Sequence, residues 1–247
     1  TRVHQETTSD ANIDLQEMRY REELSTTGNG VELKAGVIYR FNDRLRAGLA
    51  LHTPAWMTMN DAYNTSMNTT FRTPSSVDGR TAYTASSPDG LFPYKLNSPL
   101  RVAVSAAYIA GEHGLFSVDY EYADYTSMRL RPGSQLDESY TFTSENELIR
   151  AVFRPVHSVR AGTEWRSGPW YFRMGWGFAP DAYRPEDSMH AQATRTYAGG
   201  VGYRTEHLSV DLGSNYITSH FNYYPYSAAL AHLVREERNT LRTMLTI

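Results

Sequence analysis

The sequence predicts an all-β fold: an antiparallel, up-and-down β-barrel that spans a membrane. Three observations support this prediction. Apolar and polar residues alternate along many short segments, short and long connections alternate between those segments, and tyrosine is abundant, with 18 in 247 residues. Tyrosine collects at both membrane interfaces of such barrels. No apolar run approaches the roughly 18 residues that a transmembrane helix needs, so we expect strands to cross the membrane.

Composition excludes several classes of protein and site. The mean hydropathy of -0.52 resembles that of a soluble protein, but alternation hides the apolar residues of barrel strands from an average. Cysteine is absent, which rules out disulfides, thiol catalysis and thiolate metal sites. The net charge of -3 comes without a basic block, so no nucleic-acid partner is expected. We expect no cofactor and no metal.

The alternation defines nine clear strands. In the most apolar of them, Trp170, Phe172 and Trp176 share one face, and Arg173 lies on the other. A tenth strand is predicted at 13–25 and should turn into the next one at the Gly28-Asn29-Gly30 sequence. The nine predicted strands are 31–41, 44–52, 100–110, 115–125, 156–166, 170–178, 196–204, 207–216 and 239–247.

A soluble β-sandwich also alternates, with a buried apolar face and a solvated polar one. The polar faces here, however, mix Arg, Glu and Asp with many Gly, Ala and Ser, which suits a curved, water-filled lumen. The membrane interpretation requires Phe172, Trp176, Val102 and Leu49 to face lipid, away from the charged residues. A dry core formed by these side chains would contradict it.

The connection lengths favour the membrane barrel. Outer-membrane barrels have short periplasmic turns and long extracellular loops, whereas a sandwich has no reason to sort its loops by end. The pattern therefore predicts the outer membrane of a Gram-negative bacterium, with the tight turns in the periplasm. The tight connections are 41–44, 111–114, 166–169 and 204–207, and the long ones are 53–99, 128–146, 179–193 and 217–237.

Barrel closure predicts additional strands outside this chain. An open sheet edge in hydrocarbon leaves backbone groups unpaired at a cost of several kcal/mol each, and about ten strands are visible here. Residues 1–12 are polar and do not resemble a plug. We expect residues 1–247 to form a single barrel domain that belongs to a larger barrel, with sequence missing upstream.

Several segments together resemble the FadL/TodX family of outer-membrane transporters, in its Bacteroidetes-type form. The similarity covers most of residues 26–247 in the family's order. The segments that carry it are GNGVELKAGVIYR (28–40), RLRAGLALHTP (44–54), SPLR (98–101), GLFSVDYEY (114–122), VRAGTEWR (159–166) and RMGWG (173–177).

This resemblance implies a barrel of about fourteen strands, within the range of such proteins, plugged by an N-terminal hatch. It also implies transport of long-chain fatty acids or other hydrophobic compounds. The chain would match the C-terminal part, without the hatch and the first strands. Two departures stand out: the family's Asn-Pro-Ala start cannot be located, and Ile247 replaces the usual terminal aromatic residue.

The segment 53–99 is expected to be an extracellular loop that captures an apolar ligand. Six or seven contacted methylene groups, at about 0.8 kcal/mol each, would contribute roughly 5 kcal/mol, which corresponds to a dissociation constant on the order of 100 micromolar. The alternative is that these side chains pack the loop against itself. The candidate binding residues are Trp56, Met57, Met59, Phe71, Phe92 and Tyr94.

The second candidate set consists of charged residues that should face the lumen. They could guide a carboxylate or anchor a hatch, because arginine binds carboxylates bidentately. The alternative is that they form cross-strand ion pairs that hold the barrel together. The set is Lys34, Arg46, Arg101, Asp119, Glu121, Arg160, Glu164 and Arg173.

Catalytic patterns are lacking. His157 and Ser158 are adjacent in a predicted strand and so face opposite sides, and we expect no enzyme. The expected partners are membrane lipid, lipopolysaccharide, a hydrophobic small molecule and other envelope proteins. Two functions compete with transport: a non-transporting barrel that acts as scaffold or shuttle for a secretion or surface-protein complex, and an ion-permeable porin.

Overall fold

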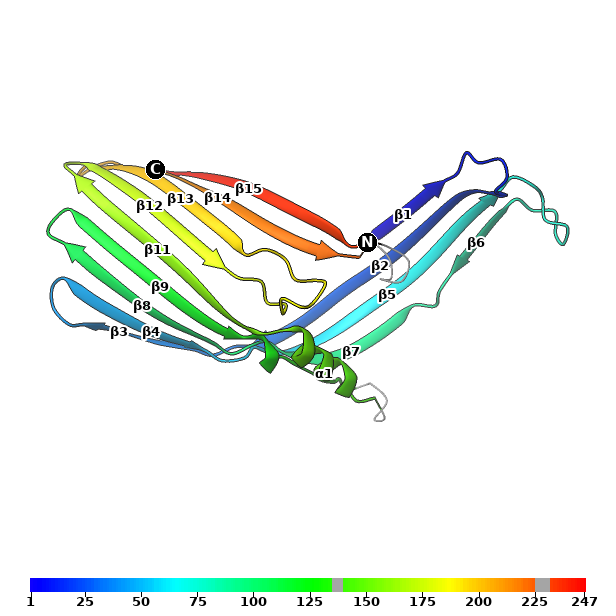
Figure 1. Cartoon of the computed structure of the whole chain (residues 1–247), viewed down its shortest axis with the longest axis horizontal. Helices are drawn as coiled ribbons and strands as arrows, with labels where there is room; N and C mark the ends of the chain where they lie inside the picture. The colour runs from blue at the N-terminus through cyan, green and yellow to red at the C-terminus, as the bar shows by residue number, and fades with distance from the viewer. Residues whose placement is uncertain (135–139, 225–231) are drawn as a thin grey trace. The chain divides into compact units, whose positions relative to one another are not determined.

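The computed structural model describes residues 1–134, 140–224 and 232–247, and Figure 1 shows the order of its elements. In this part of the chain the regular structure is almost entirely β, with one α-helix, α1 (Thr143–Val152), and one 3-10 turn (Tyr125–Ser127). Every strand pair with a defined register is antiparallel. The predicted antiparallel all-β architecture is confirmed. No helix among the described residues is long and apolar enough to cross a membrane.

The strands belong to two compact units, each with its own sheet. Unit 1 comprises residues 1–31, 56–96 and 130–142, and unit 2 comprises residues 32–55, 97–129 and 143–247. Neither sheet closes on itself in the strand order of the described chain. That both units belong to one barrel domain stays a prediction.

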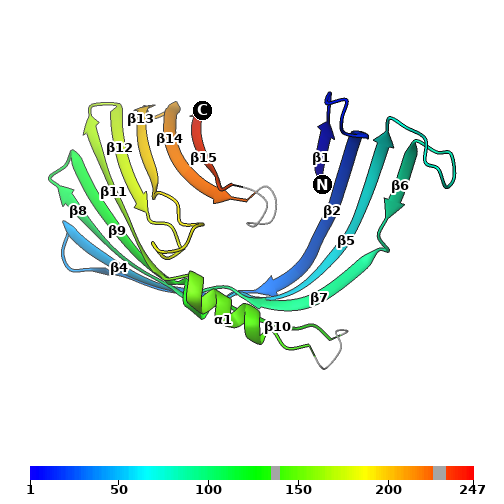
Figure 2. The same cartoon turned by 45° about the vertical axis from the view of Figure 1, so that its right-hand side comes forward.

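Unit 2 holds a nine-stranded sheet in which each strand lies beside the next one of the unit, as an up-and-down order requires. Figure 2 shows these strands side by side, curving along their length. All nine predicted strands are present. The first begins at Lys34 and not at residue 31, because Val31 is the last residue of the preceding strand, and the last two are longer than expected. The strands are β3 (Lys34–Arg40), β4 (Leu45–His52), β8 (Arg101–Ala110), β9 (Gly114–Asp124), β11 (Pro155–Ser167), β12 (Trp170–Ala179), β13 (Thr194–Arg204), β14 (Ser209–Tyr223) and β15 (Val234–Thr246).

The four predicted tight turns connect β3–β4, β8–β9, β11–β12 and β13–β14. Gly111 and Gly168 have φ angles of 65° and 56°, in the left-handed region that glycine adopts without steric cost. Neighbouring turns are joined by backbone hydrogen bonds, such as the one from the Arg166 N–H to the His113 carbonyl at 2.7 Å. The turns therefore lie together along one end of the sheet.

The register gives the sheet of unit 2 one apolar and one polar face, because directly paired residues point to the same side. One row crosses all nine strands on the apolar face: Tyr39, Ala47, Ala106, Val118, Ala161, Trp176, Tyr197, Tyr216 and Leu241. The adjacent row on the opposite face is Arg40, Arg46, Ala107, Ser117, Gly162, Gly175, Ala198, Asn215 and Arg242.

The apolar face does not form a dry core. Phe172 is 49% exposed, Leu49 is 50% exposed and Trp176 is also exposed. Among the described residues, only Ala123, Phe142 and Val156 are buried hydrophobic residues. The arrangement that would have contradicted the membrane interpretation is therefore not found in this part of the chain.

Unit 1 contains a six-stranded sheet that the sequence prediction largely missed. Its path is β1-β2-β5-β7-β10, with β6 paired to β5. In the pairs with a defined register, β2 meets both β1 and β5 in antiparallel fashion. The strands are β1 (Arg2–Thr7), β2 (Leu15–Val31), β5 (Trp56–Phe71), β6 (Ala82–Ser86), β7 (Gly90–Asn97) and β10 (Arg129–Pro132).

Two predictions about this region were wrong. The segment 53–99 is mostly strand and not a loop, and the Gly28-Asn29-Gly30 sequence lies inside β2 and not in a turn. β5 and the second half of β2 are rich in Thr, Ser, Asn and Met, so they lack the contrast between apolar and charged residues on which period-two alternation depends. β1, for which no strand was predicted, has Val3 as its single apolar residue. The expected link 128–146 likewise contains β10 and the start of α1. The first turn of α1 carries Glu145 and its last turn carries Arg150, as the helix dipole favours.

Candidate functional site

The polar face of unit 2 carries a cluster of charges around Glu32. Its carboxylate lies 3.0 Å from the Lys34 ammonium, 3.2 Å from the Arg101 guanidinium and 3.6 Å from Nδ1 of His52. Lys34, Arg101 and His52 are neighbours across β3, β4 and β8. Two of the predicted lumen residues, Lys34 and Arg101, therefore meet on one carboxylate that joins three strands.

A second cluster is centred on Arg173, in the middle of β12. Its guanidinium donates to Glu164 of β11 at 2.5 Å and to Asp211 of β14 at 2.6 Å. Asp211 also accepts from Arg204 at 3.0 Å. The guanidinium groups of Arg173, Arg204 and Arg166 all lie within 6 Å of the centre of the Tyr171 ring, where cation–π attraction operates.

The remaining predicted charges divide into a pair and two isolated groups. Arg160 lies 3.7 Å from Glu121, a long contact between neighbouring strands. Arg46 and Asp119 form no ion pair within the described residues, although both line a small hollow of about 220 Å³. Six of the eight predicted lumen charges therefore form ion pairs, as the interpretation as cross-strand pairs expects. Arg46 and Asp119 are left open to water.

Beside the Arg173 cluster, the polar face is hollowed over a volume of about 680 Å³. The floor is made of small residues from three strands: Gly175, Ala198, Gly200 and Gly213. Arg173 and Asp211 border the hollow on one side. Its other border consists of Asn215, Arg242, Met244 and Thr246. Within the described residues, the Arg242 side chain has no acidic partner, so this border can meet an anionic group.

The six predicted ligand-binding residues lie in strands β5 and β7 and not in a loop. Met57, Met59 and Phe71 alternate along β5 on one face of the sheet, whereas Trp56 points to the other. We call their side the Met/aromatic face. Through the register it also contains Met18, Tyr20, Leu24, Tyr63, Met67 and Tyr83. Methionine and aromatic side chains suit adaptable apolar contact.

Glycines create room on the Met/aromatic face. A Cβ atom on Gly28 would meet the Met59 sulfur at 2.6 Å, and one on Gly30 would meet Cγ of Met57 at 2.7 Å. The Tyr63 ring lies over Gly90 in the same manner. The thioether and phenol groups thus lie flat over neighbouring backbone, where a larger residue would displace them.

Phe92 and Tyr94, on β7, belong to an aromatic cluster. The Phe92 ring centre lies 5.9 Å from those of Tyr94, Tyr140 and Phe142, and Tyr140 and Phe142 are 5.0 Å apart in an edge-to-face arrangement. Phe142 is one of the few buried residues, with 5% of its surface exposed. Part of the predicted binding set is therefore self-packed, as the alternative interpretation of this segment expected.

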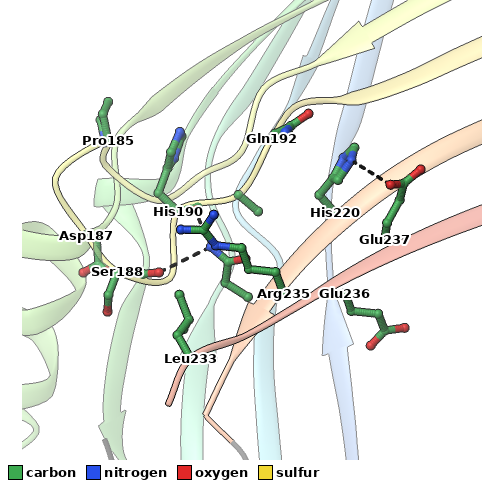
Figure 3. A pocket seen from close by; sticks show the side chains of 12 residues that line it. Pro185, Asp187, Ser188, His190, Gln192, His220, Leu233, Arg235, Glu236 and Glu237 are labelled. Atoms are coloured by element: carbon green, nitrogen blue, oxygen red, sulfur yellow. Dashed lines mark hydrogen bonds and ion pairs between the residues drawn. The ribbon is translucent and has the colours of Figure 1, made fainter.

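A third hollow, of about 720 Å³, lies between the 180–193 connection and the ends of β14 and β15 (Figure 3). Asn222 holds the connection by donating to the carbonyl oxygens of Ser188 and His190 at 3.3 and 2.5 Å. His220 and Glu237 face each other at 4.0 Å. The residues that line this hollow include acidic, basic and imidazole side chains, and these do not point toward one common position. The geometry of the hollow therefore does not specify a ligand.

Sequence reasoning missed the residues whose role depends on register. Tyr171 gathers three arginines, Tyr140 and Phe142 complete the Phe92 cluster, and glycines form the floor of the 680 Å³ hollow. Period-two alternation read across 56–71 would have placed Met57 and Met59 on one face. His157 and Ser158 do lie on opposite faces, since they pair with Tyr122 and Glu121.

Comparison with known proteins gives weak similarities. No protein-family model and no curated protein sequence matches the chain. Among solved structures it is similar to the CymD monoaromatic hydrocarbon channel, with a TM-score of 0.48 and 16% identity over 84% of this chain and 53% of that one. This chain thus spans about half of that channel.

Two further structures are similar over most of this chain. A Pseudomonas aeruginosa FadL homologue gives a TM-score of 0.44 at 9% identity, covering 98% of this chain and 75% of that one. The P. putida toluene transporter TodX gives 0.38 at 9% identity, covering 94% and 78%. Since all three TM-scores are below 0.5, the fold assignment depends on the strand register of this chain.

Proposed function

We propose that this chain is part of an outer-membrane β-barrel of a Gram-negative bacterium and that hydrophobic small molecules, such as long-chain fatty acids, cross the membrane through that barrel. The observation that carries the proposal is the apolar face of unit 2, which is nine strands wide and exposed, opposite a face of small and charged residues. The similar solved structures include proteins described as a hydrocarbon channel and a toluene transporter.

The energetics of the apolar face support a lipid environment. Fully burying a large aliphatic or aromatic side chain contributes about 1.5–3 kcal/mol, and this face leaves many of them about half exposed. In water such a surface would favour aggregation. Against lipid tails the same side chains are solvated, while the charge clusters on the other face remain in water.

Strand length is also consistent with spanning. β12 has ten residues, which extend about 33 Å at roughly 3.3 Å per residue. Tilted by about 45°, such a strand covers roughly 23 Å along the membrane normal, close to the apolar band of about 25 Å in outer-membrane barrels. The tight turns at one end of the sheet would then face the periplasm.

The Met/aromatic face is the proposed capture surface for the ligand. Met57, Met59 and Tyr63 present flexible or flat apolar surface over glycine, so they can adjust to alkyl chains or rings. For a fatty acid, each contacted methylene adds about 0.8 kcal/mol. In unit 2, Arg242 at the border of the 680 Å³ hollow offers a counterion for a carboxylate.

Uptake by whole cells tests the proposal. The full protein is produced in a Gram-negative host that lacks its own route for hydrophobic compounds, and uptake of radiolabelled oleate and toluene is measured. Replacing Met57 and Met59 together by Ser should lower the initial rate by about tenfold, since two apolar contacts are lost. The matched control, Thr65→Ser with Thr69→Ser on the same face, should retain the rate. No uptake above the empty host, with the protein present in the outer membrane, would refute transport.

A further inference from the structure

We infer that the second face of the unit 1 sheet binds the uncharged sugar chains of lipopolysaccharide. The inference rests on the outer-membrane position in the proposed function. We call the uncharged stretch of this side the hydroxyl–amide face. The β2–β5 register defines its members: Ser25, Thr27, Asn29, Val31, Trp56, Thr58, Asn60 and Ala62.

The first argument is the charge of this face. None of its eight members carries a formal charge, and all are exposed. Designed soluble surfaces aim for about 25–35% charged residues. On the same side of β2, charges return directly beyond Ser25, at Glu23, Arg21, Arg19 and Glu17. The uncharged polar stretch complements an uncharged, hydroxyl-rich ligand better than it complements an ion or an acidic chain.

The second argument is the hydrogen-bonding capacity that is left unused. In the described part of the chain, the side-chain amides of Asn29 and Asn60 make no hydrogen bond, whereas the amide of Asn64, further along β5, donates to Ser87 and Asp89 at 3.1 and 2.8 Å. Each free amide offers two donors and an acceptor. This combination can pair with adjacent hydroxyl groups on a sugar ring, which themselves both donate and accept.

The third argument is Trp56, at one end of the face. Its side chain is 46% exposed and points away from Met57 and Met59. An indole ring offers a flat apolar surface for the C–H face of a sugar. Thr58, the next residue on this side, lies about 6.6 Å along the strand, and its partner Asn29 lies about 5 Å across it. A ring platform and two polar groups thus fall within the span of one or two sugar units.

The two faces of this sheet therefore suit two different ligands. The Met/aromatic face suits an apolar molecule, and the hydroxyl–amide face suits the glycan that surrounds an outer-membrane protein on the cell exterior. Binding of this glycan would hold the sheet against the lipopolysaccharide layer without competing for the apolar ligand.

The test uses the full protein in lipid vesicles and a defined probe: the oligosaccharide released by mild acid from a lipopolysaccharide with an uncharged repeat, free of lipid A. Binding is followed by calorimetry and by tryptophan emission. Asn29→Ala with Asn60→Ala should weaken binding by about tenfold or more, because two hydrogen-bonding groups are removed. Trp56→Phe should remove the change in emission. The control, Thr65→Ala with Thr69→Ala on the Met/aromatic face, should stay within about twofold of the unaltered protein.

Three results would overturn the inference: no binding of the probe by the unaltered protein, equal loss in the control, or stronger binding of an acidic polysaccharide than of the uncharged probe. Oleate uptake by whole cells tests the proposed function independently of sugar binding. Uptake without sugar binding refutes only this inference, whereas a protein that does not enter vesicles refutes both.

Discussion

Replacing Met174 by Arg tests which face of the unit 2 sheet meets lipid. Met174 is the fifth residue of the ten-residue strand β12, lies on the apolar face and is 71% exposed. At the centre of a spanning strand, an arginine on the lipid side costs about 2–4 kcal/mol. The equilibrium between folded and unfolded protein should therefore shift by roughly 30- to 900-fold toward the unfolded state.

The measurement is reversible unfolding of the full protein in lipid vesicles by guanidinium chloride, followed by tryptophan emission. The matched control is Ala198→Arg, on the polar face of the neighbouring strand, where the hollow beside Gly175 leaves room for the side chain. Its cost should stay within about 0.5 kcal/mol, as for ordinary exposed positions. If Ala198→Arg costs more than Met174→Arg, the two faces have been assigned the wrong way round and the membrane interpretation is refuted.

Two further predictions concern unit 1. Gly30→Ala should lower the free energy of unfolding by about 1–2 kcal/mol, because its new methyl group would overlap Met57. In the control, Gly213→Ala, the added group has no atom within 4 Å, so this variant should be neutral or slightly stabilising. Equal effects of the two variants in denaturant titrations would contradict the packing of Met57 over Gly30. The Tyr83 hydroxyl donates to Asp78 at 2.6 Å and is the main cause of the lowered pKa of that carboxyl group. A lowered pKa in the folded state stabilises the fold at neutral pH, and this contribution is lost as the pH falls through that pKa. Tyr83→Phe should therefore raise the Asp78 pKa toward its ordinary value in a carbon-13 NMR titration, and an unchanged midpoint would show that the hydrogen bond is not the cause.

The sequence was sufficient to predict the strands of unit 2, because their apolar and charged residues differ sharply at alternate positions. Trp170–Ala179 is the clearest example, with Trp170, Phe172 and Trp176 on one side and Arg173 with two glycines on the other. In unit 1 the same period is present but both faces are uncharged or weakly apolar over long stretches. Trp56–Phe71 therefore resembled a loop in sequence, although it forms a strand paired along its whole length.

The charge clusters could be predicted as a set but not as pairs. Which acid meets which base depends on the register between strands, and a slip by one residue reverses every side chain. Arg173 lies opposite Glu164 because the turn at Gly168 fixes the β11–β12 register. The contact with Asp211 crosses a further strand through Gly202, whose lack of a side chain leaves the path clear.

The glycine floor of the 680 Å³ hollow also affects the mechanics of the sheet. Gly200 and Gly213 face each other across β13 and β14, and the ladder between these strands runs from Arg195 to Arg204 without a shift in register. Curvature in a sheet comes either from bulges or from glycines that relieve crowding on the concave side. With no bulge in this ladder, the glycine pair is the feature that removes side-chain crowding on the polar side, while the pairing of β13 with β14 continues unbroken across it.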